Sequence, residues 1–245
     1  FTDYDITEEE KRWMEGVEYM RSFPLTDTEI EINKYLREGK SVLAEGAQGT
    51  MLDIDHGTYP FVSSSSTVCG GVCTGLGVAP LSIGEVFGIF KAYSTRVGAG
   101  PFPVELFDSV GDTIRHIGNE YGAVTGRNRR CGWLDLVALK YAIMINGVTD
   151  LVMMKGDVLD DFDTIKVCTA YTKDGETRTS MPYDTEGWQP VYEELPGWKT
   201  PLTALRSEAD FPEAFKQYIA YIEQATGTPL SIVSVGPDRD ATYLR

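Results

Sequence analysis

The segment from Thr149 to Asp157 places the strongest constraint on how this chain can fold. Its apolar run, residues 151–154, is continuous rather than alternating, which is typical of a strand buried on both faces of a parallel sheet. A stretch with apolar residues at helical spacing, residues 134–145, precedes it. We therefore predict an α/β fold, in which ligands bind at the carboxyl ends of the parallel strands.

Two further apolar runs extend this prediction. We expect strands at residues 42–45 and 231–235, so that a central, mainly parallel sheet is flanked by helices. Residues 83–93 form a mixed apolar run that fits either a helix or a strand. The length of the chain, 245 residues, suffices for one large domain with a substantial core.

An antiparallel addition to this sheet is expected near the middle of the chain. Residues 165–171 and 176–181 flank a turn that contains Asp174-Gly175, which is the pattern of a β-hairpin. Residues 192–198, which include two glutamates, a proline and a glycine, are expected to form a loop.

Helices are predicted at both ends of the chain. Thr7 and Glu10 have the spacing of a capping box, and a second helix is expected from Thr26 to Lys40, ended by Gly39. We expect both of these helices to be packing elements. The third, from Ala209 to Ala225, carries an apolar face.

The composition excludes several classes of protein. A net charge of −15 argues against nucleic-acid binding and against a basic membrane-surface role. No run of 18 apolar residues and no charged-then-apolar leader occurs, so we expect no membrane span and no signal peptide. The four cysteines lack the spacing of a zinc site and fit reduced thiols in a cytoplasmic protein. Because the chain starts at Phe1 without Met, we expect it to be the later part of a longer protein.

The stretch from Glu45 to Ser66 is the first candidate binding segment. Glycines at 46, 49 and 57 let the backbone turn sharply and approach a ligand closely, and amide and hydroxyl side chains lie between them. An ordinary connection between a strand and the next element is the alternative.

The second candidate is the stretch from Gly122 to Trp133. Arg127, Arg129 and Arg130 lie within four positions, and arginine forks suit carboxylate or phosphate groups. A solvated basic turn is the alternative interpretation.

The third candidate is the strand end at Lys155-Gly156-Asp157. A carboxylate there can accept hydrogen bonds from the N1–H and the exocyclic amine of guanine, and the lysine stem can lie along the base. A charged strand terminus is the alternative. The last strand runs into Ser234-Val235-Gly236, where small residues can present backbone N–H groups to a ligand oxygen.

Taken jointly and in order, these segments resemble the adenylosuccinate synthetase family over most of the chain, from about residue 40 to its end. The resemblance is carried by Glu45–Thr50 with Asp53–Pro60, Thr95–Pro103, Thr125–Arg130, Lys155–Asp157 and Ser234–Arg239. It implies GTP-dependent ligation of IMP and L-aspartate to adenylosuccinate, with GDP and phosphate, in AMP biosynthesis. The intermediate would be 6-phosphoryl-IMP.

The resemblance also implies roles for individual residues. IMP would be contacted by Gln48, Ser63 (where the family usually has Thr), Val97 and Arg127. Aspartate would be bound by Ala123, Val124 (for a common Thr), Thr125, Gly126, Arg127, Asn128 (for a common Arg) and Arg129. GTP would be contacted by Arg129, Lys155, Gly156, Asp157, Ser234, Val235 and Gly236.

The family's catalytic acid and base, its Mg²⁺ ligands and its glycine-rich phosphate loop have no match here. We therefore assign no catalytic residue and no metal ligand in this chain, and expect those of Mg²⁺ upstream. Residues 1–245 would be the C-terminal portion of one domain, an incomplete P-loop-NTPase-like fold, in a cytoplasmic homodimer. A non-catalytic guanine-nucleotide-binding module that keeps only the base pocket is the alternative.

Overall fold

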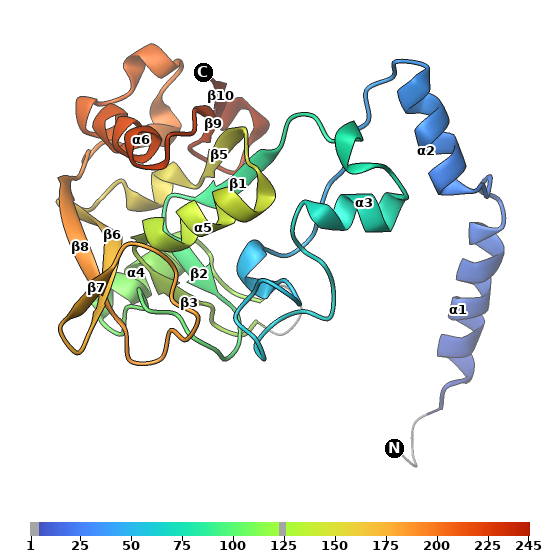
Figure 1. Ribbon diagram of the computed structural model, residues 1–245, viewed down its shortest axis with the longest axis horizontal. Helices are drawn as coiled ribbons and strands as arrows, with labels where there is room; N and C mark the ends of the chain where they lie inside the picture. Colours follow the sequence, from blue (N-terminus) through green and yellow to red (C-terminus); the bar gives the residue numbers. More distant parts are fainter. Residues whose placement is uncertain (1–4, 123–125) are drawn as a thin grey trace. The chain divides into compact units, whose positions relative to one another are not determined.

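The computed structural model describes residues 5–122 and 126–245, and the chain divides into two units. The larger unit comprises Glu45–Gly71 and Ile83–Arg245, and the smaller one comprises Phe1–Ala44 and Val72–Ser82. Figure 1 shows the helices and strands, most of them labelled. Among the described residues, no helix combines the length and the apolar character that crossing a membrane requires.

A four-stranded sheet with the order β1-β5-β9-β10 is the centre of the larger unit. Its three parallel strands are β1 (Phe87–Lys91), β5 (Asp150–Met154) and β9 (Leu230–Ser234), and β10 (Thr242–Leu244) runs antiparallel to β9. Leu151, Met153 and Val233 are fully buried in it. The predicted α/β fold with a central, mainly parallel sheet is confirmed, and residues 83–93 prove to hold a strand.

A second sheet contains the predicted hairpin. Strand β6 (Thr164–Lys173) pairs antiparallel with both β7 (Glu176–Arg178) and β8 (Gln189–Pro196), and parallel with the short β4 (Leu134–Asp135). Asp174 and Gly175 form the turn with positive φ values of 51° and 83°, a conformation that glycine adopts without a steric penalty. A third, two-stranded sheet joins β2 (Ser94–Arg96) to β3 (Arg130–Gly132).

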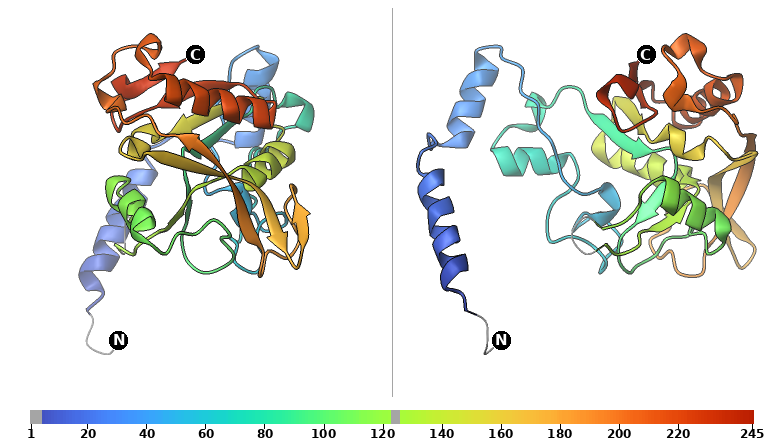
Figure 2. Two further views of the ribbon diagram at one scale, coloured as in Figure 1. Left: turned by 90° about the vertical axis from the view of Figure 1, so that its left-hand side faces the viewer. Right: turned by 180° about the vertical axis from the view of Figure 1, so that it is seen from behind.

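Three helices pack around these sheets: α4 (Ser109–Ile117), α5 (Leu136–Asn146) and α6 (Glu213–Thr226). Helices α5 and α6 contact each other, while α5 also contacts β6 and α6 contacts β8. The left-hand view of Figure 2 shows the β6–β8 pair running beneath α6. Phe215, Tyr218, Ile219 and Ile222 of α6 are buried, as its apolar spacing predicts.

The connections contain six short 3₁₀ turns among the described residues: η1 (Thr50–Leu52), η2 (Pro80–Ser82), η3 (Gly156–Leu159), η4 (Leu202–Ala204), η5 (Glu208–Asp210) and η6 (Arg239–Ala241).

The smaller unit contains α1 (Thr7–Met20) and α2 (Thr28–Arg37), and α3 (Gly70–Leu76) extends into it. The Asn33 amide donates to the carbonyl oxygens of Glu29, at 2.7 Å, and Gly77, at 2.8 Å, which ties α2 to the 72–82 segment. The predicted helices are therefore present. Neither buries a described side chain, so the packing role expected of them is not found within this unit.

Three local predictions are wrong. The Thr7 capping box is absent, because the Asp5 carboxylate instead accepts hydrogen bonds from the Thr7 N–H and hydroxyl, at 2.9 and 2.5 Å. Residues 42–45 form no strand and are exposed; the strands beside β5 are β1 and β9. Most of 192–198 belongs to β8, an edge strand whose partner within the described part of the chain is β6, and edge positions tolerate its prolines and glutamates.

A buried hydrogen bond between two side chains joins α5 to the second sheet, and its contribution to stability can be tested. The Tyr171 hydroxyl donates to the Asp135 carboxylate at 2.5 Å, and that carboxylate also caps α5 by accepting from the Ala138 N–H at 3.0 Å. Tyr171→Phe should lower the free energy of unfolding by about 1–3 kcal/mol, because a buried acceptor loses its donor. Equilibrium urea unfolding measures this, with the exposed Tyr183→Phe as control. Equal losses in the two variants would contradict the prediction.

Candidate functional site

The carboxylate of Glu120 is fully buried and accepts four hydrogen bonds. Its Oε1 accepts from Lys91 Nζ at 2.7 Å, from Lys155 Nζ at 2.7 Å and from the Tyr93 hydroxyl at 2.6 Å. Its Oε2 accepts from Arg129 Nη1 at 2.7 Å. Three cationic side chains therefore share one carboxylate, and we call Glu120, Lys91, Tyr93, Lys155 and Arg129 the Glu120 cluster.

The topology of the main sheet explains why these residues meet. Lys91 ends β1 and lies in register with Met154, the last residue of the parallel strand β5. Lys155 follows β5 directly, so both lysines lie at the carboxyl edge of the sheet. Glu120 reaches this edge from the turn after α4, where Asn119 has a positive φ of 48°.

Electrostatics keep this buried carboxylate ionised. Burial by itself raises the pKa of Glu120, but the hydrogen bonds from Lys155, Lys91 and Tyr93 outweigh it and lower the pKa to about 2. Burial lowers the pKa of Lys91, and Glu120 opposes that shift. The pKa of Tyr93 is raised by burial and by its hydrogen bond to Glu120. The cluster consequently carries a net positive charge, from three cations against one carboxylate.

The predicted guanine segment starts at this cluster. Lys155 has left-handed backbone angles (φ 61°, ψ 39°) and caps the 3₁₀ turn η3, which contains Gly156 and Asp157. Its ammonium also donates to the Gly118 carbonyl at 2.6 Å. Asp157 is half-buried, and burial raises the pKa of its carboxyl. The carboxylate accepts a hydrogen bond from its own backbone N–H, and among the described residues no hydrogen bond joins it to another side chain.

The second predicted guanine segment lies on the neighbouring strand. Because β9 runs parallel to β5 with Val233 opposite Met153, Ser234, Val235 and Gly236 reach the same edge as Lys155. The Val235 N–H already donates to the Ala241 carbonyl at 2.9 Å, and the Ser234 hydroxyl donates to the Gly236 carbonyl at 3.1 Å. The Val235 N–H is therefore already bonded within the protein and is not available to a ligand.

The arginine loop connects to the cluster through Arg129. Of its predicted aspartate-binding residues, Ala123, Val124 and Thr125 lie outside the described residues, whereas Gly126, Arg127 and Asn128 are exposed. The Arg129 N–H donates to the Glu120 carbonyl at 3.0 Å. Arg130 instead pairs with Glu105 and donates to the Gly100 carbonyl at 2.7 Å.

The loops that carry the predicted IMP residues are joined by Arg96. Its buried guanidinium donates from Nη2 to the Thr58 hydroxyl and the Phe61 carbonyl, both at 3.0 Å, and from Nε to the Ala99 carbonyl at 3.0 Å. These contacts tie the stretch that contains Ser63 to the stretch that contains Val97. Val97 is 58% exposed, so its side chain is accessible to a ligand.

The Glu45–Ser66 stretch is ordered by a second buried carboxylate. Asp53 accepts from the backbone N–H groups of Asp55, His56, Thr67 and Val68 at 2.7–3.1 Å. These bonds outweigh burial and lower the pKa of Asp53. Gln48 precedes this region, is exposed and has a positive φ of 70°. Hydrogen bonds thus hold the backbone around Asp53, while Gln48 before it is exposed.

Sequence reasoning missed Glu120, Lys91 and Tyr93. A lone glutamate between a helix and an arginine loop gives no signal of burial, because its two lysine partners are 29 and 35 residues away in the chain.

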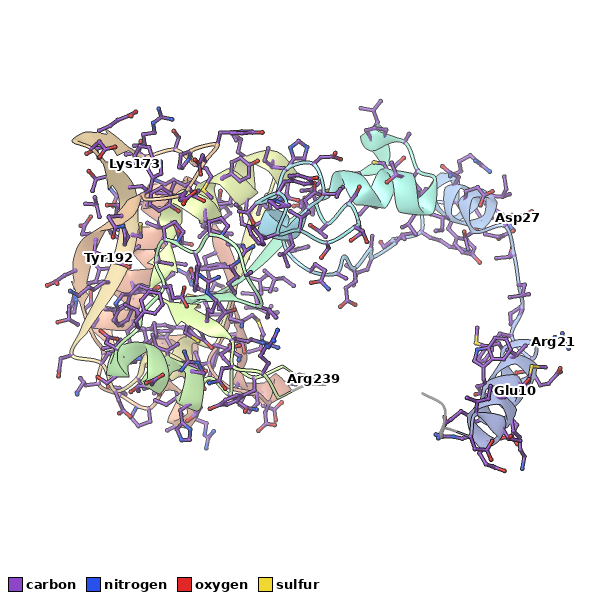
Figure 3. The ribbon with its side chains drawn as sticks, turned by 90° about the horizontal axis from the view of Figure 1, so that it is seen from below. Glu10, Arg21, Asp27, Lys173, Tyr192 and Arg239 are labelled. Carbon is purple, nitrogen blue, oxygen red and sulfur yellow. The ribbon has the colours of Figure 1, made fainter. Side chains whose placement is uncertain are left out.

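A separate open depression of about 420 Å³ lies at the β6–β7 hairpin, between Lys173 and Trp188. Figure 3 places Lys173 on the opposite side of the larger unit from Arg239, which follows the β9 strand end. The depression is therefore separate from the predicted site.

One family of known proteins matches nearly the whole length of this chain. Residues 1–243 match the family described as adenylosuccinate synthetase. The adenylosuccinate synthetases of Bacteroides thetaiotaomicron and Christiangramia forsetii are 66% and 55% identical to this chain, and each comparison covers 99% of the chain but 58% of the relative. A fully ligated adenylosuccinate synthetase from Plasmodium falciparum has the same fold, with a TM-score of 0.92 at 39% identity, covering 100% of this chain and 59% of that one.

The Glu120 cluster makes stability depend on pH. The pKa of Glu120 is lowered from 4.5 to about 2 on folding, so its contribution is fully present above pH 4.5 and is lost as pH falls towards 2. Glu120→Gln should therefore differ most from wild type at pH 5–6, and the difference in unfolding free energy should shrink at pH 4 and 3. Urea unfolding at each pH measures it, with the exposed Glu45→Gln as control. A difference that stays constant with pH would contradict the assignment.

Proposed function

The chain belongs to the adenylosuccinate synthetase family, and we propose that the protein containing it joins IMP to L-aspartate with hydrolysis of GTP. In the first step the γ-phosphoryl group of GTP is transferred to O6 of IMP, which yields GDP and 6-phosphoryl-IMP. In the second, the amino group of aspartate attacks C6 and displaces phosphate, forming adenylosuccinate. Phosphorylation turns a poor leaving oxygen into a good one, so the site works mainly by positioning and by stabilising charge.

In this proposal the guanine base of GTP binds at the carboxyl edge of β5 and β9. The Asp157 carboxylate accepts from N1–H and the exocyclic amine, a donor pair that adenine lacks. The Lys155 stem lies along the base, and Gly156 with Ser234–Gly236 forms the surrounding backbone. The half-buried carboxylate of Asp157 and the closeness of the two strand ends support this assignment.

The loop residues then bind the other two substrates. Thr125, Arg127 and Arg129 donate to the carboxylates of aspartate, with Ala123, Val124, Gly126 and Asn128 shaping the same loop. Arg129 approaches GTP as well. Gln48 reads the hypoxanthine edge of IMP, Ser63 donates to its phosphate, and Val97 and Arg127 complete that wall. The exposure of Gln48, Val97 and Arg127 supports these roles.

The remaining parts of the proposal come from the family resemblance. Residues 1–245 form the C-terminal portion of one synthetase domain, and the protein acts as a cytoplasmic homodimer with Mg²⁺. Within residues 5–122 and 126–245, no group of three or more metal-ligating side chains could hold an ion. We therefore assign no Mg²⁺ ligand among these described residues and derive no step through a metal here.

The observation that carries the proposal is the meeting of Lys155, Arg129 and the β9 strand end at one sheet edge. Its test is an assay of the full-length protein for adenylosuccinate formation, in which IMP, aspartate and GTP are omitted in turn. We expect product only when all three are present. Binding of guanine nucleotide without any product would instead favour a non-catalytic nucleotide-binding module.

Selection of guanine gives a sharper prediction. Asp157→Asn should weaken GTP binding by about 2–5 kcal/mol, which is about thirtyfold or more in Kd, because a charge-assisted buried pair is lost. The variant should relatively favour XTP, since the new amide can donate to the xanthine oxygen. Calorimetric titration with both nucleotides measures this, and the exposed Asp161→Asn is the matched control. Unchanged GTP affinity in Asp157→Asn would refute the guanine assignment.

A further inference from the structure

The two oxygens of Glu120 connect two segments to which the proposed function gives different substrates. Oε1 holds Lys155, at the guanine strand end, and Oε2 holds Arg129, in the aspartate loop. We propose that Glu120 is a positioning residue that couples guanine binding to aspartate binding by orienting both cations. This inference rests on the proposed function and adds to it a residue that contacts neither substrate.

Lys155 depends on Glu120 for its orientation. A lysine side chain has four rotatable carbon bonds and loses about 2 kcal/mol of rotamer freedom when it is fixed. Here the ammonium is held from two directions, by Glu120 Oε1 at 2.7 Å and by the Gly118 carbonyl at 2.6 Å. The backbone of the same residue is fixed in the left-handed region. With both ends of its side chain held, the stem of Lys155 is preorganised beside Asp157, where the guanine is proposed to bind.

Arg129 is held by the same residue through two different groups. Its guanidinium donates to Glu120 Oε2 at 2.7 Å, and its backbone N–H donates to the Glu120 carbonyl at 3.0 Å. Its own carbonyl accepts from Arg115 Nε at 2.8 Å. Arg129 Nε is buried and has no hydrogen-bond partner among the described residues. Glu120 is thus the side chain that sets the direction of this guanidinium.

Coupling follows from the sharing of one carboxylate. If a ligand draws Lys155 or Arg129 towards itself, the charge and geometry seen by the other cation change, because Lys155 shares Oε1 with Lys91 while Arg129 pairs with Oε2 of the same carboxylate. Such a change in one site alters the affinity of the other by the same factor in both directions. The net positive charge of the cluster, in a chain of net charge −15, suits anionic ligands at this edge.

The test compares Glu120→Gln with Glu105→Gln in the full-length protein. Glu105 is the matched control, because its carboxylate pairs with the neighbouring Arg130 and not with Lys155 or Arg129. We expect Glu120→Gln to raise the Kd for GDP and the KM for aspartate at least tenfold each, and to change kcat less than threefold. In wild type, GDP and aspartate should alter each other's Kd, and this coupling should disappear in Glu120→Gln.

A double-mutant cycle separates positioning from a general structural effect. Because Glu120 acts through Lys155, adding Glu120→Gln to the Lys155→Met variant should raise its Kd for GDP less than threefold. Additive effects, or an equal loss in Glu105→Gln, would overturn the inference. If Glu120→Gln does not fold, Tyr93→Phe removes one bond to the same oxygen, and it should raise both constants about two- to fivefold. Unchanged constants in Tyr93→Phe would then overturn the inference.

The outcomes also separate this inference from the proposed function. If wild type binds GDP but forms no adenylosuccinate, the proposed ligase reaction fails. The double-mutant cycle, measured by the Kd for GDP, still tests the role of Glu120 at the guanine site. If wild type forms adenylosuccinate but the cycle is additive, the positioning role fails alone. Absence of GDP binding in wild type would overturn both.

Discussion

The candidate site depends on one buried carboxylate that is fully paired. An isolated ionised carboxylate in a protein interior costs several kcal/mol, whereas a pair with good geometry offsets that cost. Glu120 is fully buried and meets Lys91, Lys155, Arg129 and Tyr93 at 2.6–2.7 Å. Because these partners come from different parts of the chain, satisfying this single charge requires the strand ends and the arginine loop to converge.

The parallel sheet determines where this convergence takes place. Strands β1, β5 and β9 are neighbours and run in one direction, so the residues that follow each of them gather at one edge, as in other open α/β sheets. A second set of contacts fixes the surrounding loops. Arg96 joins two of them, and the Asp53 carboxylate accepts from two backbone N–H groups of the glycine-rich stretch and from two of the residues that follow it, Thr67 and Val68. Polar side chains thus give irregular segments a defined shape next to a rigid sheet.

Much of the fold could be predicted from local patterns, since the continuous apolar run before Lys155 and the Asp174-Gly175 turn each specify one structure. Residues 42–45 could not, because a short apolar run does not reveal whether a partner strand is available. Residues 192–198 were misassigned because an edge strand tolerates charges and prolines. For the site, Lys155, Asp157 and the arginines were recognisable as residue types in sequence. Glu120 was not, because its importance comes from burial and from partners distant in the chain.

A crystal structure of the full-length protein with GDP and aspartate bound would test the central claim most directly. The account predicts the guanine ring beside Lys155, with N1–H and the exocyclic amine donating to Asp157, and aspartate held by the arginine loop. Glu120 should still contact both Lys155 and Arg129 in that complex. A nucleotide bound away from the β5–β9 edge, or a Glu120 side chain that contacts neither cation, would contradict the account.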